Sequence, residues 1–242
     1  MKAKPEITEA EYQGGRNASA LPRLSARLEM VTRLVPSGAA VADIGTDHGL
    51  AAVWLYQSGC RRVVAADINR GPLESARRTA MQYGLENELG FALSNGFDAL
   101  DKSELDAAVI AGMGGETIAE ILSQLTEDER MRIVPVVQPQ SKLDELCAFA
   151  EKLGYSLDDA DICRDAGRIY MAMRLRYTGA GAVCDPISVL AARGGELINS
   201  WLRRRLEILG RELDGARLSG RNEHAEKLAR QITVLESLLQ NS

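Results

Sequence analysis

The sequence predicts a doubly wound α/β fold, in which helices cover both faces of a mostly parallel sheet. Between residues 22 and 178, short apolar runs typical of buried strands alternate with amphipathic stretches at helical spacing. The last two runs, 155–167 and 168–179, have no helix between them and therefore predict an antiparallel hairpin at one edge of the sheet. After residue 185 only helical periodicity remains, which predicts a small helical hairpin appended to the sheet.

The parallel part of the sheet is expected to contain five strands. Pro72 in the first turn of one predicted helix and Gly84 at its end are typical start and stop signals. The strands are predicted over 39–45, 61–67, 88–96, 105–113 and 132–139, and the helices over 21–35, 50–59, 71–84, 115–125 and 141–154.

Two apolar stripes predict the C-terminal helical hairpin, and residues 219–222 separate them. The stripes consist of Ile198, Leu202, Leu206, Leu209 and Leu213, and of Leu228, Ile232, Leu235 and Leu239. We therefore expect a loose N-terminal tail over 1–20, a sheet domain over 21–180 and a helical domain over 181–242.

Composition excludes some classes of protein. No apolar run approaches the length of a membrane-spanning helix, and the polar start of the chain is unlike a signal peptide. The net charge of −5 argues weakly against nucleic acid, but residues 200–242 hold eight basic and six acidic side chains, so a basic patch remains open there. Four scattered cysteines without a C-x-x-C motif, and only two histidines, argue against a zinc site. We expect reduced thiols and a cytoplasmic protein.

The turn after the first strand, "VADIGTDHG", carries the first functional signal. Ligands of doubly wound sheets bind at the carboxyl ends of the strands, and here Asp43 and Asp47 stand among glycines without a G-x-G-x-x-G motif. A pyrophosphate prefers bare backbone N–H groups, whereas an ammonium and a sulfonium would be attracted by the two acids. Asp67, at the end of the second strand, is suitably placed for ribose hydroxyls. These residues favour S-adenosylmethionine over NAD.

Structural alternatives exist for the same residues. Asp47 could cap the following helix, with Gly45 and Gly49 only permitting the turn, and Asp67 could be a plain surface acid. The glycine-rich "AGMGG" after the fourth strand either lets a flat ligand approach the backbone or simply forms a tight turn into a helix. The Asn/Asp-Pro-Pro-aromatic tetrad of many exocyclic-amine methyltransferases is absent, which points away from N6 chemistry.

A family resemblance joins these segments. "LSARLEMVTRLVPSGAAVADIGTDHG", "ADINRGPLESARRTA", "VIAGMGGETIAEIL" and "VVQP" occur in the order and spacing of the bacterial TrmK family, which the chain resembles over roughly residues 24–240. Members of that family are tRNA adenine-22 N1-methyltransferases. The resemblance implies a Rossmann-like class I methyltransferase sheet with a coiled-coil-like helical domain, S-adenosylmethionine as cofactor and tRNA as partner.

The resemblance also implies roles for individual residues. Asp67 would hold the ribose, and Met113 would stand beside the transferable methyl. The expected cofactor-binding residues are Asp43, Gly45, Thr46, Asp47, Gly49, Asp67, Ile68, Asn95, Gly96, Ala111, Gly112, Met113 and Gly114. The expected catalytic residues are Asp47, to stabilise developing positive charge, His48, to handle a proton, and Met113. His48 could instead be a helix-start residue bonded to a backbone carbonyl.

Three positions depart from the family pattern. The chain has "DHGLAA" where "DHAYLP" is common, and Asn95-Gly96 where an Asp-Gly pair is common. An Asn amide can accept or donate, so a contact with the adenine amino group is compatible with the change. The chain also has "QPQ", Gln138 to Gln140, where "QPN" is frequent, which would affect specificity if this segment reads the target base.

The predicted RNA contacts are concentrated on the helical hairpin, because guanidinium groups fork onto phosphates. They are Trp201, Arg203, Arg204, Arg205, Arg211, Arg217 and Arg221, together with Gln138, and Arg16, Arg23 and Arg27 are weaker candidates. The alternative is a solvated helical face. Three other functions stay open: a methyltransferase acting on another RNA or a small molecule, an NAD oxidoreductase, which the missing glycine motif disfavours, and a non-catalytic RNA-binding or dimerising module. The sequence leaves monomer and homodimer equally open and indicates no metal or membrane partner.

Overall fold

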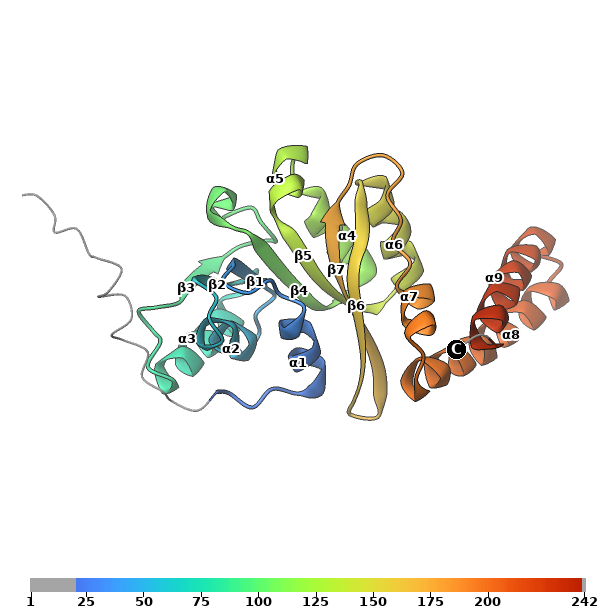
Figure 1. Ribbon diagram of the computed structural model, residues 1–242, viewed down its shortest axis with the longest axis horizontal. Coiled ribbons are helices and arrows are strands. Elements are labelled where there is room, and N and C mark those ends of the chain that lie inside the picture. The colour runs from blue at the N-terminus through green and yellow to red at the C-terminus, as the bar shows by residue number, and fades with distance from the viewer. Residues whose placement is uncertain (1–20, 241–242) are drawn as a thin grey trace, which may run out of the picture.

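The computed structural model describes residues 21–240, and its centre is one seven-stranded sheet with the strand order β3-β2-β1-β4-β5-β7-β6 (Figure 1). The first five strands are parallel and the last two antiparallel, as expected. The strands are β1 (Ala40–Ile44), β2 (Arg62–Asp67), β3 (Gly90–Leu93), β4 (Ala107–Gly114), β5 (Val134–Ser141), β6 (Tyr155–Asp165) and β7 (Arg168–Tyr177). The predicted tail, 1–20, lies outside the described residues.

Helices cover both faces of the sheet. In β4, the buried side chains alternate between the two cores, with Ala107 and Val109 on one face and Ala108 and Ile110 on the other. α1, α2 and α3 pack on the first face and α4 and α6 on the second. The helices are α1 (Ala26–Arg33), α2 (Leu50–Gln57), α3 (Arg70–Gln82), α4 (Gly115–Ser123), α5 (Glu127–Arg132), α6 (Leu143–Lys152), α7 (Pro186–Arg193), α8 (Glu196–Leu218) and α9 (Asn222–Gln240).

β6 and β7 form the predicted antiparallel edge hairpin. They pair from Tyr155↔Tyr177 to Asp165↔Arg168, and the two residues that connect them, Ala166 and Gly167, both have positive φ. This backbone is typical of a tight hairpin turn. β7 pairs with β5 through only two residues, so the far end of the edge hairpin extends past the sheet (Figure 1).

α8 and α9 form the predicted helical hairpin, and it is joined to the sheet by a shared core. Ala160 of β6 and Met171 of β7 pack in one apolar cluster with Leu190 of α7 and Ile198 of α8. α7 and α8 both contact β6. The proposed domain boundary at residues 180 and 181 stays a prediction.

Two short helices were not predicted, although each has a recognisable start signal. Thr126 and Glu129 form a capping box at the start of α5. Asp185 caps α7, with Pro186 at its first position. The start signals of both helices are therefore present in the sequence.

β4 and β5 end later than predicted, β4 at residue 114 instead of 113 and β5 at residue 141 instead of 139. β4 continues to Gly114, with a register shift between Ala111 and Met113, and β5 continues to Ser141. Gly112 lies at the irregularity with φ +80°, a conformation that glycine adopts without strain. "AGMGG" is therefore a bulged strand end that leads directly into α4, and "QPQ" is strand rather than loop.

Candidate active site

The turn between β1 and α2 is held in one conformation by the neighbouring strand. The backbone N–H groups of Gly45 and Thr46 both donate to the carbonyl oxygen of Ala66 in β2, at 2.8 and 3.1 Å. Gly45 and Gly49 have φ of +77° and +71°, which a β-carbon would strain. The sequence expectation that these glycines permit the turn is confirmed.

Asp43 is a buried carboxylate at the end of β1. Its Oδ2 accepts a hydrogen bond from Thr46 Oγ1 at 2.7 Å. Burial raises the pKa of Asp43 to about 6; the Thr46 bond opposes this shift and the nearby charge of Asp67 adds to it. At neutral pH the site therefore holds a mostly ionised acid whose desolvation a cationic ligand would offset.

Asp47 and His48 lie in the open mouth of this turn. Their side chains are 73 % and 67 % exposed, with His48 Nε2 3.6 Å from Asp47 Oδ2 and His48 Nδ1 2.9 Å from Ser75 Oγ. The capping alternative for Asp47 is wrong, because Gly49 is the N-cap of α2 and no side chain caps it. The backbone-carbonyl alternative for His48 is also not seen. Both side chains are accessible to a ligand.

The end of β2 presents an acid next to an apolar surface. Asp67 Oδ1 accepts from the backbone N–H of Asn69 at 2.8 Å, so the carboxylate has a fixed orientation and capacity for further donors. The adjacent Ile68 is 61 % exposed, which is unusual for an isoleucine in a well-packed protein. The Asp67 carboxylate can accept hydrogen bonds from a ribose diol, and the exposed Ile68 side chain can pack against the face of an adenine.

The loop after β3 is fixed by a residue that the sequence reading missed. Gln124, the C-cap residue of α4, accepts from the N–H of Phe97 at 2.6 Å and donates to the carbonyl of Asn95 at 3.2 Å. Gly96 has φ +61°, and a β-carbon there would overlap Gln124. The Asn95 side chain is exposed. Nothing in the local sequence around Gln124 indicates this role, because its partners are about 27 residues away.

The bulged end of β4 faces the β1 turn. A β-carbon on Gly45 would overlap the Met113 side chain, so the two residues are in direct contact. A β-carbon on Gly112 would lie 3.3 Å from Arg27 Nη1 and 3.6 Å from Gln140 Nε2. The structure therefore brings together the predicted methyl-transfer residues with Arg27 of α1 and Gln140 of β5.

Gln138 is not on the surface, and the expectation that it contacts RNA directly is wrong for this conformation. Its side chain is fully buried; Oε1 accepts from Arg27 Nη1 at 3.0 Å and Nε2 donates to the Pro139 carbonyl at 2.7 Å. Gln138 lies inside β5, beneath Arg27 of α1. Gln140 is the exposed member of the "QPQ" segment.

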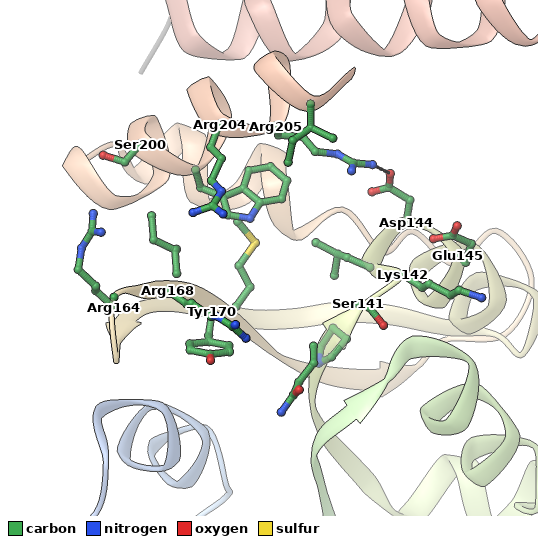
Figure 2. Close-up of a pocket in the computed structure, with 18 of the residues that line it drawn as sticks. Ser141, Lys142, Asp144, Glu145, Arg164, Arg168, Tyr170, Ser200, Arg204 and Arg205 are labelled. Carbon is green, nitrogen blue, oxygen red and sulfur yellow. Dashed lines mark hydrogen bonds and ion pairs between the residues drawn. The ribbon is translucent and has the colours of Figure 1, made fainter. Parts of the chain in front are cut away.

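The basic residues expected on the helical hairpin do not share one surface. Trp201, Arg204 and Arg205 line a groove of about 640 Å³ between α8, the end of β5 and the edge hairpin (Figure 2). Arg203, Arg211, Arg217 and Arg221 do not line this groove. Of the weaker candidates, Arg27 lies at the active site, Arg23 is exposed, and Arg16 lies outside the described residues.

The described residues fit an adenosine-containing cation better than a metal or a dinucleotide. Acids end β1 and β2, an exposed isoleucine follows, and glycine turns with positive φ surround them. Within residues 21–240, no group of three or more His, Cys, Asp and Glu side chains could hold a metal ion, and no helix is long and apolar enough to cross a membrane. All four cysteines, which fall in this range, are free thiols.

Comparisons with known proteins point to one kind of enzyme. A methyltransferase domain family matches residues 24–173. The tRNA (adenine(22)-N(1))-methyltransferase of Bacillus subtilis is 32 % identical over 187 residues, which are 75 % of this chain and 76 % of that protein. The crystal structure of the B. subtilis M1A22 tRNA methyltransferase TrmK has the same fold, with a TM-score of 0.78 and 24 % identity over 90 % of this chain and 99 % of that one.

A third relative was solved with a ligand. It is a Streptococcus pneumoniae protein described as a putative tRNA (m1A22) methyltransferase in complex with S-adenosyl-L-methionine. It superposes with a TM-score of 0.76 and 24 % identity, over 90 % of this chain and all of that one.

Proposed function

Because this chain belongs to the bacterial TrmK family of class I methyltransferases, we propose that it transfers a methyl group from S-adenosylmethionine to N1 of adenine 22 in tRNA. The observation that carries the proposal is the placement of Asp43 and Asp67 at the carboxyl ends of the adjacent strands β1 and β2. Two acids at this position suit a cofactor with a cationic amino acid end and a ribose, and they oppose a pyrophosphate.

The cofactor-binding residues follow from this arrangement. Asp67 would accept from the ribose hydroxyls, Ile68 would cover one face of the adenine, and Asn95 would lie at its edge. The ionised Asp43, together with the β1 turn, favours the ammonium end. Gly45 and Gly96 permit the close approach of the Met113 and Gln124 side chains, which a β-carbon would overlap.

The methyl acceptor would bind at the bulged end of β4. S-adenosylmethionine supplies an electrophilic methyl, which the lone pair of adenine N1 attacks in line. Met113, packed on Gly45, and the backbone at Gly112 would form the wall that positions the base. Such positioning can supply about 7–11 kcal/mol of a barrier. The methylated adenine is cationic, and the carboxylate of Asp47, which is 73 % exposed, would stabilise that charge as it develops.

N1 belongs to the Watson–Crick edge, so the target adenine must leave its stack before it can react, at a cost of a few kcal/mol. The protein must therefore hold the surrounding RNA. Its place of action would be the cytoplasm. Of the open alternatives, a methyltransferase with another substrate differs only in the acceptor, and a non-catalytic RNA-binding module predicts that cofactor is irrelevant.

One experiment separates these functions. The wild type and Asp67→Ala are incubated with S-adenosylmethionine and unmodified tRNA, the modified nucleoside and its position are identified, and thermal shifts are measured with S-adenosylmethionine, S-adenosylhomocysteine and NAD. We expect N1-methyladenosine at position 22 with wild type only. A ligand at 100 times its Kd stabilises by about 2.7 kcal/mol, and Asp67→Ala should lose that shift.

Methylation at another nucleoside would replace the proposed substrate and keep the reaction class. Stabilisation by NAD alone, or none by any ligand, would overturn the proposed function.

A further inference from the structure

The groove beside the active site has a positive local charge, opposite in sign to the net charge of the chain. Its walls hold five basic side chains, Lys142, Arg164, Arg168, Arg204 and Arg205, and three acidic ones, Asp144, Glu145 and Glu212. The local balance is positive, although the whole chain carries −5. Three segments far apart in sequence build it: residues 139–145, 164–171 and 200–212.

Two of the five basic side chains are already neutralised. Arg205 Nη2 lies 3.0 Å from Asp144 Oδ2, and Lys142 pairs with Glu116. Arg164, Arg168 and Arg204 are exposed and have no ion pair with any residue in the described range 21–240. They belong to opposite walls: Arg204 reaches into the cavity from α8, and Arg164 rises towards it from the edge hairpin (Figure 2).

One aromatic side chain of the groove is available for stacking, Trp201 of α8. The ring of Tyr170 in β7 points the other way, towards Arg27 of α1 (Figure 2). An aromatic ring beside arginines is the usual surface for an unpaired nucleic-acid strand, because the ring stacks on a base while guanidinium groups contact phosphates. An acidic peptide would use the charges but would leave the Trp201 ring without a flat partner.

The groove is continuous with the methyl-transfer end of the sheet. Gln140 lines it and would also lie 3.6 Å from a β-carbon on Gly112. The guanidinium of Arg27 lies 6.0 Å from the centre of the Tyr170 ring and donates to Gln138 at 3.0 Å. A strand held in the groove would therefore run past the point where the reacting adenine must be placed.

We propose that this groove binds the tRNA strand next to the target adenine, with Arg164, Arg168 and Arg204 on phosphates and Trp201 against an extruded base. This inference rests on the proposed function. It assigns to the edge hairpin half of an RNA-binding surface that the sequence placed mainly on the helical hairpin. Removing one charge from each wall should weaken tRNA binding while cofactor binding stays intact.

The test compares two double variants that lose the same charge. Arg164→Gln with Arg204→Gln removes one arginine from each wall. The control, Arg78→Gln with Lys227→Gln, removes two exposed basic side chains of α3 and α9 that do not line the groove. The Kd for unmodified tRNA is measured by filter binding between about 50 and 200 mM salt, where phosphate contacts have their largest effect. Melting temperature and the thermal shift with S-adenosylmethionine are measured on each protein.

We expect the groove variant to bind tRNA about tenfold more weakly, with the slope of log Kd against log salt reduced by about 2, one for each lost phosphate contact. The control should retain wild-type binding, and both variants should keep the cofactor shift. Equal binding by the groove variant and the control, with wild type still methylating tRNA, would overturn the groove and leave the proposed function standing.

Loss of binding in the groove variant, from a wild type that methylates no adenine N1, would support the groove and overturn the proposed function. A wild type that binds a poly-glutamate peptide in this groove, and no tRNA, would overturn both.

Discussion

The cofactor end of the sheet and the groove beside it are built on opposite principles. At the end of β1 the carboxylate and the turn are buried or fixed by backbone: Asp43 is 4 % exposed, and the Gly45 and Thr46 N–H groups bond to β2. In the groove the important groups are long, exposed side chains such as Arg164 and Arg204. The first region tolerates little change at a single atom, whereas the second distributes its binding energy over several weak contacts.

This difference predicts a ranking of mutational effects. A β-carbon at a packed turn overlaps atoms that cannot move, and a buried charge strongly changes stability. An exposed arginine gives a small effect that salt reduces further. The following changes test that ranking from the largest expected effect to the smallest.

Gly49→Ala should cause the largest loss. Gly49 is buried with φ +71°, and a β-carbon there would lie 2.8 Å from the Cα of Ala76 in α3. We expect the free energy of unfolding to fall by about 3 kcal/mol, of which about 1 comes from the left-handed backbone and the rest from overpacking. Chemical denaturation measures this fall in the free energy of unfolding. The thermal shift with S-adenosylmethionine should also disappear.

Gly38→Ala is the matched control, because Gly38 has the same φ of +71° and nothing within 4 Å of its hypothetical β-carbon. It should lose only the backbone part, about 1 kcal/mol. Equal losses in the two variants would show that the contact between the β1 turn and α3 contributes nothing to stability. The tightly packed turn would then be no more sensitive to mutation than an open one.

Asp43→Asn should stabilise the ligand-free protein and weaken cofactor binding. Burial raises the pKa of Asp43 from 3.8 to about 6, so the native state holds this proton more tightly than the unfolded chain does. The stability that the protonated form provides is complete below about pH 4 and is lost as pH rises through about 6. A shift of about two units corresponds to about 3 kcal/mol. Asn cannot ionise, so the Asp43→Asn variant should not lose stability as pH rises.

Thermal unfolding at about pH 4 and about pH 7.5 checks the sign of this effect: the gain in Asp43→Asn should appear only at the higher pH. Calorimetric titration with S-adenosylmethionine should show a weaker Kd at the higher pH. In the wild type, affinity should fall as pH decreases through about 6, where Asp43 takes up its proton. An equal gain in stability at both pH values would contradict the assignment of the effect to this carboxylate.

Arg204→Gln and Arg203→Gln should show the smallest effects and the sharpest contrast. The two residues are adjacent on α8 and both exposed, but only Arg204 lines the groove. We expect Arg204→Gln to raise the Kd for tRNA about threefold, as exposed charge pairs contribute roughly 0.2–1 kcal/mol, and Arg203→Gln to leave it unchanged. Neither should change the melting temperature. Equal effects would return the RNA contact to the whole helical hairpin, as the sequence suggested.

The sequence alone determined the fold, the edge hairpin, the helical hairpin and the acids of the cofactor end. Strand and helix periods determine which side chains are buried. Parallel strands bring their carboxyl ends to one edge of the sheet, so Asp43 of β1 and Asp67 of β2 lie at the same edge. The short helices α5 and α7 could have been found from their caps.

Only the tertiary structure decided which residues face the substrate side. Within β5, Gln138 is buried beneath Arg27 of α1 while Gln140 is exposed, and Gln124 reaches Phe97 across 27 residues of sequence. The same holds for the arginines of α8. Their position along the helix is local, but which of them face the groove depends on how α8 packs against Ala160 and Met171 of the edge hairpin. That packing joins segments distant in the chain, and no local pattern records it.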